Sequence, residues 1–139
     1  MIICISMISG CSSESPADSA DPVVYENREL GFSIEFPDTW ENRYSVEANP
    51  DYPSGVIVKT EWGGTLCFIY KETAEEWKEN GEGESIPVEY RVLGENDERV
   101  YILYFPSDAN YDIEDEEQTR VYQEMREDLY HIGFKILEQ

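Results

Sequence analysis

The chain has 139 residues, of which 31 are acidic and 10 are basic, so its formal net charge is −21 at pH 7. This length suits one domain, and a hydrophobic content of 40% excludes a disordered chain. Such a charge repels phosphate backbones, so we expect neither a nucleic-acid partner nor direct binding of the folded domain to anionic lipid. The simplest interpretation is a solvated acidic surface, with cations, basic proteins or basic cell-wall components as alternative partners.

The first eleven residues are typical of a membrane-targeting signal. Residues 1–10 are uncharged and mostly apolar, and the run is too short to span a bilayer as a helix. The motif Ile-Ser-Gly-Cys at residues 8–11 resembles the bacterial lipobox, which ends in a lipidated cysteine. We therefore expect residues 1–11 to be a lipoprotein signal peptide that is truncated at its start, because such leaders begin with Lys or Arg. Lipid on Cys11 would anchor the protein on the outer face of the cytoplasmic membrane.

The segment after Cys11 has the composition of a linker. Residues 12–22 consist of Ser, Ala, Asp, Glu and Pro, which predicts a flexible tether, and residues 23–139 are expected to form a single domain. Once the leader is removed and Cys11 carries lipid, Cys67 is the remaining thiol. Cys67 lies in the apolar run 66–69, so we expect a small buried hydrophobic residue rather than a nucleophile.

Several short runs have the apolar and polar alternation of β-strands. The predicted strands, in chain order, are residues 23–25, 32–36, 43–47, 56–60, 65–70, 88–93, 99–105 and a short final segment at 134–137. Glycine-containing turns separate two of the pairs, at residues 61–64 and 94–97, so each pair is predicted to be a hairpin.

Two segments have the patterns of helices. Thr73 and Glu76 match a capping box and predict a short helix that ends before residue 81. A longer helix is predicted over residues 114–131, with Asp112 as its N-cap. Its apolar stripe consists of Val121, Met125, Leu129 and Ile132. The order of elements favours an α+β fold, with a mainly antiparallel sheet of about six or seven strands packed with two helices.

Aromatic, glycine and proline residues recur in a pattern that resembles small secreted lipoproteins of Gram-positive bacteria. The matching segments are residues 25–27, 31–37, Trp40, 100–108, Tyr111 and 132–136. These lipoproteins look like members of the PsbP/Mog1-like fold, so the resemblance implies an α/β/α sandwich over residues 23–137. It also implies an accessory or binding role, because the better-known members of that fold are an accessory subunit of photosystem II and a small-GTPase partner. The resemblance assigns no functional residue.

Residues suited to catalysis are sparse in this sequence. The single histidine, His131, is predicted at the end of the long helix, where the helix dipole favours a cation. One histidine and one buried cysteine cannot supply the ligands of a zinc site. The sequence has no nucleophile motif and no phosphate-binding glycine loop, so we expect no cofactor. Because 31 acidic residues make some carboxylate pair inevitable, a carboxylate-based hydrolase stays as a second alternative function.

The acidic segment 108–117 is the best candidate for a cation site. Asp108, Asn110 and Asp112 supply oxygen ligands at alternate positions, as in the first half of a calcium-binding loop. The match then fails, because Ile113 stands where such loops have glycine. Capping of the following helix is the simpler explanation of Asp112, and calcium binding through this segment is kept as the alternative function.

Four aromatic residues are predicted in or near loops at the strand ends: Trp40, Tyr44, Tyr52 and Trp62. If exposed, these rings would stack on a sugar or anchor a partner protein, and if buried they would form the ends of the core. The predicted protein is therefore a monomeric, lipid-anchored extracytoplasmic accessory or binding module without catalytic activity. Its expected partners are the membrane, through Cys11, and a protein or cell-wall component.

Overall fold

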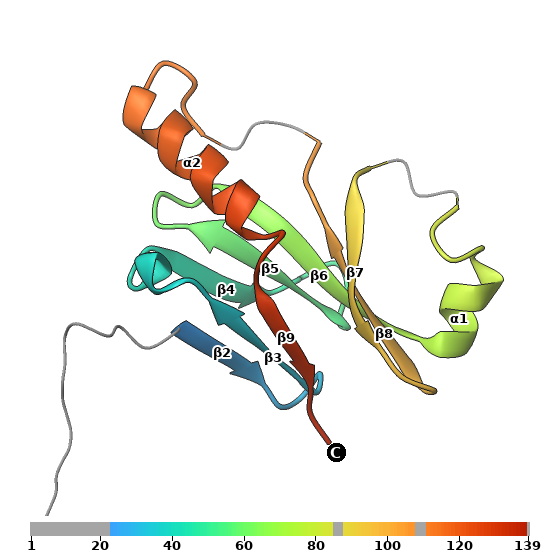
Figure 1. The fold of residues 1–139 in the computed structure, drawn as a ribbon. Coiled ribbons are helices and arrows are strands. Elements are labelled where there is room, and N and C mark those ends of the chain that lie inside the picture. The colour runs from blue at the N-terminus through green and yellow to red at the C-terminus, as the bar shows by residue number, and fades with distance from the viewer. Residues whose placement is uncertain (1–22, 85–87, 108–110, 139) are drawn as a thin grey trace, which may run out of the picture.

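The computed structural model describes residues 23–84, 88–107 and 111–138. Within these ranges eight β-strands form two sheets, and all paired strands are antiparallel. Two α-helices complete this part of the fold (Figure 1). The predicted α+β class with mainly antiparallel pairing is confirmed. The prediction of one sheet with six or seven strands was wrong, because the chain termini of the domain form a small sheet of their own.

The small sheet has three strands in the order β2-β3-β9. These are β2 (Val23–Asn27), β3 (Phe32–Phe36) and β9 (Gly133–Ile136). The alternation predicted for residues 32–36 is confirmed, because Phe32, Ile34 and Phe36 are buried while the two residues between them are more exposed. The central strand β3 therefore joins the first and last strands of the domain and directs one apolar face into the core.

The large sheet has five strands in the order β4-β5-β6-β8-β7. These are β4 (Tyr44–Ala48), β5 (Gly55–Thr60), β6 (Thr65–Thr73), β7 (Tyr90–Glu95) and β8 (Arg99–Tyr104). Both predicted hairpins form, as β5–β6 and β7–β8. The second turn lies later than predicted, because Gly94 still pairs with Tyr101. The Asn96 side chain then accepts hydrogen bonds from the amides of Glu98 and Arg99, both at 2.8 Å.

The two faces of the five-stranded sheet are covered by different elements. Successive residues of β8 point to opposite faces, with Tyr101 and Leu103 on one face and Ile102 on the other. The first face packs against the three-stranded sheet and α2 (Glu116–Asp128) in the main core. The second face packs against α1 (Ala74–Glu79) in a smaller core. In Figure 1, α2 lies across β5 and β6, whereas α1 lies at the other end of the sheet, beyond β8.

The capping box predicted for the first helix is confirmed. The Thr73 hydroxyl accepts a hydrogen bond from the Glu76 amide at 3.0 Å, and the Glu76 carboxylate accepts one from the Thr73 amide at 3.2 Å. The helix is only six residues long, and Trp77 is its buried residue. Its position against the sheet therefore depends on one large side chain.

The long helix begins later than predicted, and its N-cap is Asp115 rather than Asp112. The Asp115 carboxylate accepts hydrogen bonds from the two amides that follow Glu116, at 3.0 and 3.1 Å. Asp112 instead accepts from the Glu114 amide at 2.9 Å, which makes a local turn before the helix. The predicted apolar stripe is confirmed, because all four of its members are buried: Val121, Met125, Leu129 and Ile132.

A buried hydroxyl joins the two sheets. Tyr101 lies on β8, and its hydroxyl donates to the carbonyl oxygen of Leu30 at 2.5 Å and accepts from Arg99 at 2.9 Å. The Phe32 ring meets the Tyr101 ring edge to face, with centroids 5.4 Å apart. Because this buried polar group is fully hydrogen-bonded, it fixes the relative position of the sheets without the cost of an unpaired group.

Candidate functional site

Trp40 and Tyr44, two of the four predicted loop aromatics, belong to the main core. Trp40 is 1% exposed, and its ring stacks on Phe36 with centroids 4.5 Å apart. Its indole nitrogen donates to the Asp128 carboxylate at 3.0 Å. Tyr44 is half-buried against the same rings, 4.9 Å from Phe36. Trp40 is therefore a core residue and offers no surface to a partner, contrary to the binding interpretation of this residue.

Trp62 and Tyr52 lie in different surroundings. Trp62 is half-buried and packs against the main core, on the same side of the large sheet as Trp40. Tyr52 lies in the loop between β4 and β5, and its ring centroid is 4.4 Å from that of Tyr70. The four predicted loop aromatics therefore do not form one surface. Trp40, Tyr44 and Trp62 pack in or against the main core, whereas the Tyr52 ring lies beside Tyr70.

The predicted cation segment is only partly described by the structure. Asp108 and Asn110 lie outside the described residues, and Asp112 is exposed. The Asp112 amide donates to the Gln118 side chain at 3.1 Å, in addition to the turn that its carboxylate forms. Within the described residues, no three acidic, histidine or cysteine side chains are placed to hold a metal ion. Calcium binding by this segment stays a prediction.

Three further residues were considered in the sequence analysis: Cys67, His131 and Cys11. Cys67 is completely buried, and burial raises the pKa of its thiol far above the usual range, which confirms the small buried hydrophobic residue. His131 is exposed just after α2, with its Nε2 3.8 Å from the Glu127 carboxylate. Cys11 lies outside the described residues. No helix in the described part of the chain is long and apolar enough to cross a membrane.

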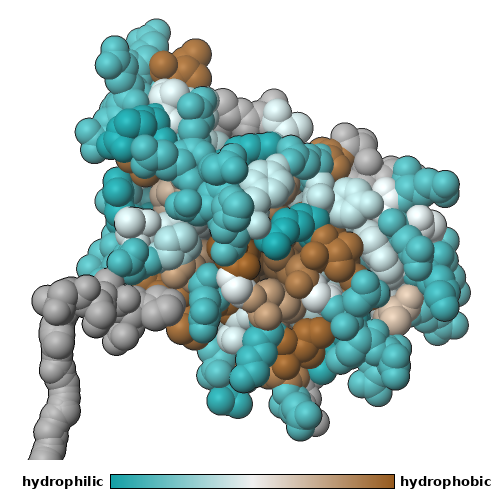
Figure 2. Space-filling model, viewed as in Figure 1, coloured by the Kyte–Doolittle hydropathy of each residue, from teal (hydrophilic) through white to brown (hydrophobic). Residues whose placement is uncertain are grey.

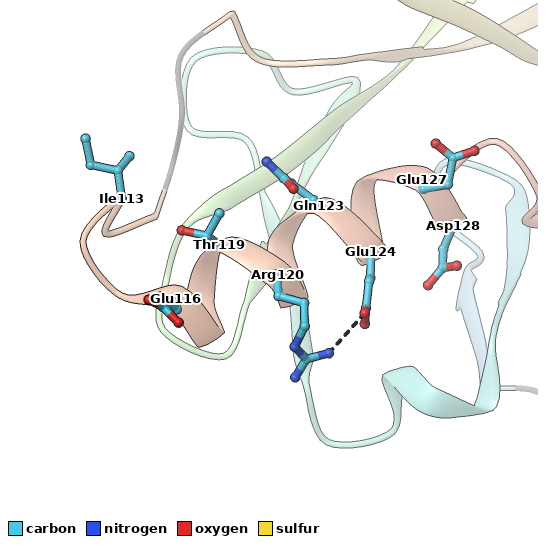
Figure 3. Close-up of a pocket in the computed structure, with 8 residues that line it drawn as sticks. All are labelled: Ile113, Glu116, Thr119, Arg120, Gln123, Glu124, Glu127 and Asp128. Carbon is cyan, nitrogen blue, oxygen red and sulfur yellow. Dashed lines mark hydrogen bonds and ion pairs between the residues drawn. The ribbon is translucent and has the colours of Figure 1, made fainter.

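A groove of about 590 Å³ runs along the outer side of α2. Figure 3 shows its lining, in which every residue except Ile113 comes from this one helix. Arg120 forms an ion pair with Glu124 at 3.0 Å, and Asp128 accepts the hydrogen bond of the Trp40 indole. These charges already have partners within the domain, and no second element converges on the groove. The groove therefore lacks the convergent polar groups of a binding site.

A row of aromatic rings crosses the face of the large sheet that α2 does not cover. We define this tyrosine face by five half-buried residues: Tyr52, Phe68, Tyr70, Tyr90 and Tyr104. Ring centroids lie 5.1 Å apart for Tyr70 and Tyr104, and 6.3 Å apart for Tyr104 and Tyr90. With the contact of Tyr52 to Tyr70, the row runs continuously from the β4–β5 loop across β6 and β8 to β7.

Small residues hold these rings in place. A Cβ at Gly55 would lie 2.3 Å from the Tyr70 ring, so only glycine leaves room for that ring to lie on β5. The buried Asn49 side chain donates to the Tyr70 hydroxyl at 3.2 Å. At the other end, Gly83 has φ +92°, and a Cβ there would lie 2.3 Å from the Tyr90 hydroxyl. Tyr70 and Tyr90 therefore pack closely against the backbone of neighbouring segments.

An acidic cavity of about 300 Å³ lies at one end of the tyrosine face. Its lining consists of Tyr52, Glu72, Glu76, Glu79 and Asn80. Burial, and then the charge of Glu76, raise the pKa of Glu72, while hydrogen bonding to Asn80 and Tyr104 opposes this rise. Burial also raises the pKa of Tyr104, and the charge of Glu72 acts in the same direction. The acidic cavity and the rings are therefore electrostatically coupled.

Sequence analysis identified only Tyr52 among these residues. Phe68, Tyr70 and Glu72 follow one another at a spacing of two, which places them on one face of β6. This spacing was the available signal, but residues 65–70 are largely apolar on both faces, which is also typical of a central strand that is covered on both sides. The signal was insufficient because a sequence does not show how little of one face a six-residue helix covers.

The chain matches no protein-family model, no curated protein and no solved structure. The likeness to PsbP/Mog1-like lipoproteins therefore stays a prediction from short segments such as residues 31–37 and 132–136. What the domain can bind has to follow from its own side chains, and the tyrosine face with its acidic cavity is an aromatic surface whose rings stay partly accessible.

Proposed function

We propose that this protein is a lipid-anchored extracytoplasmic module without catalytic activity that binds a partner protein on its tyrosine face. The observation that carries the proposal is the row of half-buried rings from Tyr52 to Tyr90. Tyrosines are enriched at the energetic centres of protein interfaces, because they supply a large contact area and a polar group with little loss of side-chain freedom. Rings that are already held in place lose even less freedom on binding.

The tyrosine face differs from an ordinary core in how far it is covered. The smaller core on this side contains only three buried side chains among the described residues, Trp77, Val100 and Ile102. The tyrosines around them keep part of their surface accessible. Figure 2 shows the side of the molecule that carries β9. Most of this surface is hydrophilic, and its hydrophobic residues gather in the middle, around β9. There Phe134 and Ile136 pack against the main core and so have a structural role.

The membrane part of the proposal rests on the lipobox-like motif that ends at Cys11. A diacylglycerol on this thiol, followed by a tether over residues 12–22, would keep the domain close to the membrane. We also propose that the domain is a PsbP/Mog1-like α/β/α sandwich. The placement of α1 and α2 on opposite faces of the large sheet supports this relation.

Site-specific photocrosslinking tests the binding surface. A benzoylphenylalanine is placed at Tyr104 or Tyr52 in the protein expressed from its own gene, and at Gln123 on the exposed side of α2 as the matched control. We expect one discrete crosslinked partner from the first two positions and none from the third. Equal crosslinking at all three positions, or none at Tyr104 and Tyr52, would contradict the proposed surface.

Lipid labelling tests the anchor separately. Radiolabelled palmitate should label the wild-type protein and should not label Cys11→Ala, and that variant should leave the membrane fraction. A Cys11→Ala protein that stays membrane-bound to the same extent would remove the anchor from the proposal, while the binding surface would be judged by the crosslinks alone.

A further inference from the structure

Asn80 ends α1 and is followed by Gly81. No other asparagine of the chain has a glycine after it. The glycine matters because, without a Cβ, its backbone nitrogen reaches the asparagine side chain with the least steric hindrance. Attack of that nitrogen on the side-chain amide carbon closes a five-membered ring, which is the first step of asparagine deamidation. Asn80 and Gly81 therefore have the covalent arrangement for this reaction.

The last turn of a short helix holds this pair in its present conformation. The Asn80 amide donates to the Glu76 carbonyl oxygen at 3.0 Å, and the Gly81 amide donates to the Lys78 carbonyl oxygen at 3.1 Å. Both Asn80 and Gly81 are exposed, and the ψ angle of Asn80 is 13°. Ring closure requires the Gly81 nitrogen to leave Lys78 and the Asn80 backbone to rotate. In a helix of six residues this opening needs little free energy, because short helices are marginal and their ends fray first.

Two other asparagines are held in ways that oppose the same reaction. The Asn96 side-chain oxygen accepts hydrogen bonds from the amides of Glu98 and Arg99, both at 2.8 Å. Asn49 is 8% exposed, and it is followed by Pro50, whose nitrogen carries no proton to lose. Asn96 and Asn49 are therefore internal standards against which the reactivity of Asn80 can be measured.

Deamidation would place a new carboxylate among existing ones. Asn80 lines the acidic cavity together with Glu72, Glu76 and Glu79. Among the described residues, none of the ion pairs involves these three glutamates. A carboxylate at residue 80 would lie at the C-terminal end of α1, where the helix dipole repels negative charge, and four residues after Glu76, where like charges repel along a helix. Each of these effects destabilises α1.

We propose that Asn80 is a deamidation site whose product loosens α1 from the smaller core. The Gly81 nitrogen loses its proton and bonds to the Asn80 side-chain carbon, and the side-chain nitrogen leaves as ammonia. Water then opens the cyclic imide and leaves aspartate or isoaspartate at residue 80. The net change is the exchange of ammonia for water, so no oxidant, reductant or second protein is needed.

The consequence for the surface follows from how α1 is attached. Trp77 is the buried residue of this helix, and it packs with Val100 and Ile102 in the smaller core. Loosening of α1 therefore adds these three apolar side chains to the accessible surface of the sheet face that carries the tyrosines. The inference concerns the domain alone and does not depend on the proposed partner.

Peptide mapping by mass spectrometry tests the reaction. The full chain carrying Cys11→Ser is aged in mildly alkaline buffer, and an isoaspartyl methyltransferase identifies the isoaspartate product. Asn80 should convert at least about tenfold faster than Asn96 and Asn49, because those two are held in place and lack a following glycine. Conversion at Asn80 that is no faster than at Asn96 would overturn the proposal.

Hydrogen exchange tests the effect on α1. Asn80→Asp carries the charge of the product, Asn80→Gln keeps the amide and closes a ring far more slowly, and Gln123→Glu adds the same charge on the exposed side of α2. The amides of residues 74–84 should exchange about fivefold faster in Asn80→Asp than in the wild type, and at the wild-type rate in the other two variants. Ageing should speed this exchange in the wild type and should not do so in Asn80→Gln.

Two results of the exchange experiment would contradict the proposal. If Asn80→Asp exchanged no faster than Gln123→Glu, the new charge would not loosen α1. If ageing changed Asn80→Gln as much as the wild type, the cause of the loosening would lie at another residue. Neither result bears on the tyrosine face as a partner surface, which crosslinking at Tyr104 tests separately.

Discussion

The two faces of the five-stranded sheet differ in what their side chains do. On the face below α2, Val58 and Leu103 are at most 1% exposed, and they pack into the main core with the three-stranded sheet. On the tyrosine face, a six-residue helix buries the centre around Trp77 and leaves Tyr70 and Tyr104 half-buried. One sheet thus supports the fold on one side and displays aromatic rings on the other. Substitutions on the two faces should therefore have different consequences.

The largest expected difference is in stability. Leu129 is completely buried at the end of α2, so Leu129→Ala should lower the free energy of unfolding by about 2–5 kcal/mol. Tyr52→Ala, on the tyrosine face, should cost about 1 kcal/mol, because the ring is only half-buried. Urea unfolding of both variants measures the difference. Equal losses would mean that the tyrosine face is simply a second core.

The next comparison concerns two tyrosine hydroxyls of β8 on opposite faces. Tyr101→Phe leaves the Leu30 carbonyl and one Arg99 donor without their partner, and should cost about 1–3 kcal/mol. Tyr104→Phe removes the hydroxyl that hydrogen-bonds Glu72 on the half-buried tyrosine face, and should cost less, about 0.5–1 kcal/mol. Thermal melting of the two variants side by side gives the result. A larger effect at Tyr104 would reverse the assigned roles of the faces.

The start of α2 provides a smaller test on the covered side. Asp115→Ala removes the cap that accepts two backbone amides, and should lower stability by about 1 kcal/mol. Asp112→Ala removes one hydrogen bond of an exposed turn and should have less effect. Circular dichroism during thermal unfolding measures both variants. If Asp112→Ala were the more damaging change, the helix would begin where the sequence pattern predicted it.

The smallest expected effect is the pH dependence of Glu72. Its pKa is raised in the folded protein by burial and by Glu76, so the native state binds this proton more tightly than the unfolded chain. Stability therefore falls as pH rises from the ordinary glutamate pKa through the raised one, and the penalty is fully present above the raised pKa. Glu72→Gln should relieve it, with a gain of about 0.5 kcal/mol or less at neutral pH.

The pH series also contains its own control. The gain from Glu72→Gln should shrink as pH falls through the ordinary glutamate pKa and be lost at about pH 3, where the carboxyl is protonated in both the folded and the unfolded protein. Glu75→Gln, at an exposed carboxylate of α1, is the control variant for the loss of one surface charge. If the gain in stability from Glu72→Gln persisted in acid, its cause would be packing of the glutamine side chain and not the loss of charge.

Local patterns predicted much of the secondary structure. Alternation identified the strand at residues 32–36, spacing of four and three identified the stripe of α2, and Thr73 with Glu76 identified the start of α1. These features depend on residues close together in the chain. The N-cap of α2 was predicted wrongly, because Asp112 and Asp115 are equally suitable residues and the turn formed by Asp112 decides between them.

Features that depend on distant residues were not predictable in this way. The separate small sheet requires β3 to pair with β9, about a hundred residues later, for which no local pattern exists. The burial of Trp40 depends on a hydrogen bond to Asp128, which is 88 residues away. Likewise, the tyrosine face forms only because the order β6-β8-β7 brings Tyr70, Tyr104 and Tyr90 together.

Hydroxyl-radical footprinting of the protein, purified and in the intact cell envelope, tests the binding role of the tyrosine face most directly. Tyr52, Tyr70 and Tyr104 should be oxidised in the purified protein and protected in the envelope. Tyr44 is half-buried on the opposite side of the sheet and should be oxidised to the same extent in both. Equal oxidation of all four tyrosines in the two preparations would contradict a partner on the tyrosine face.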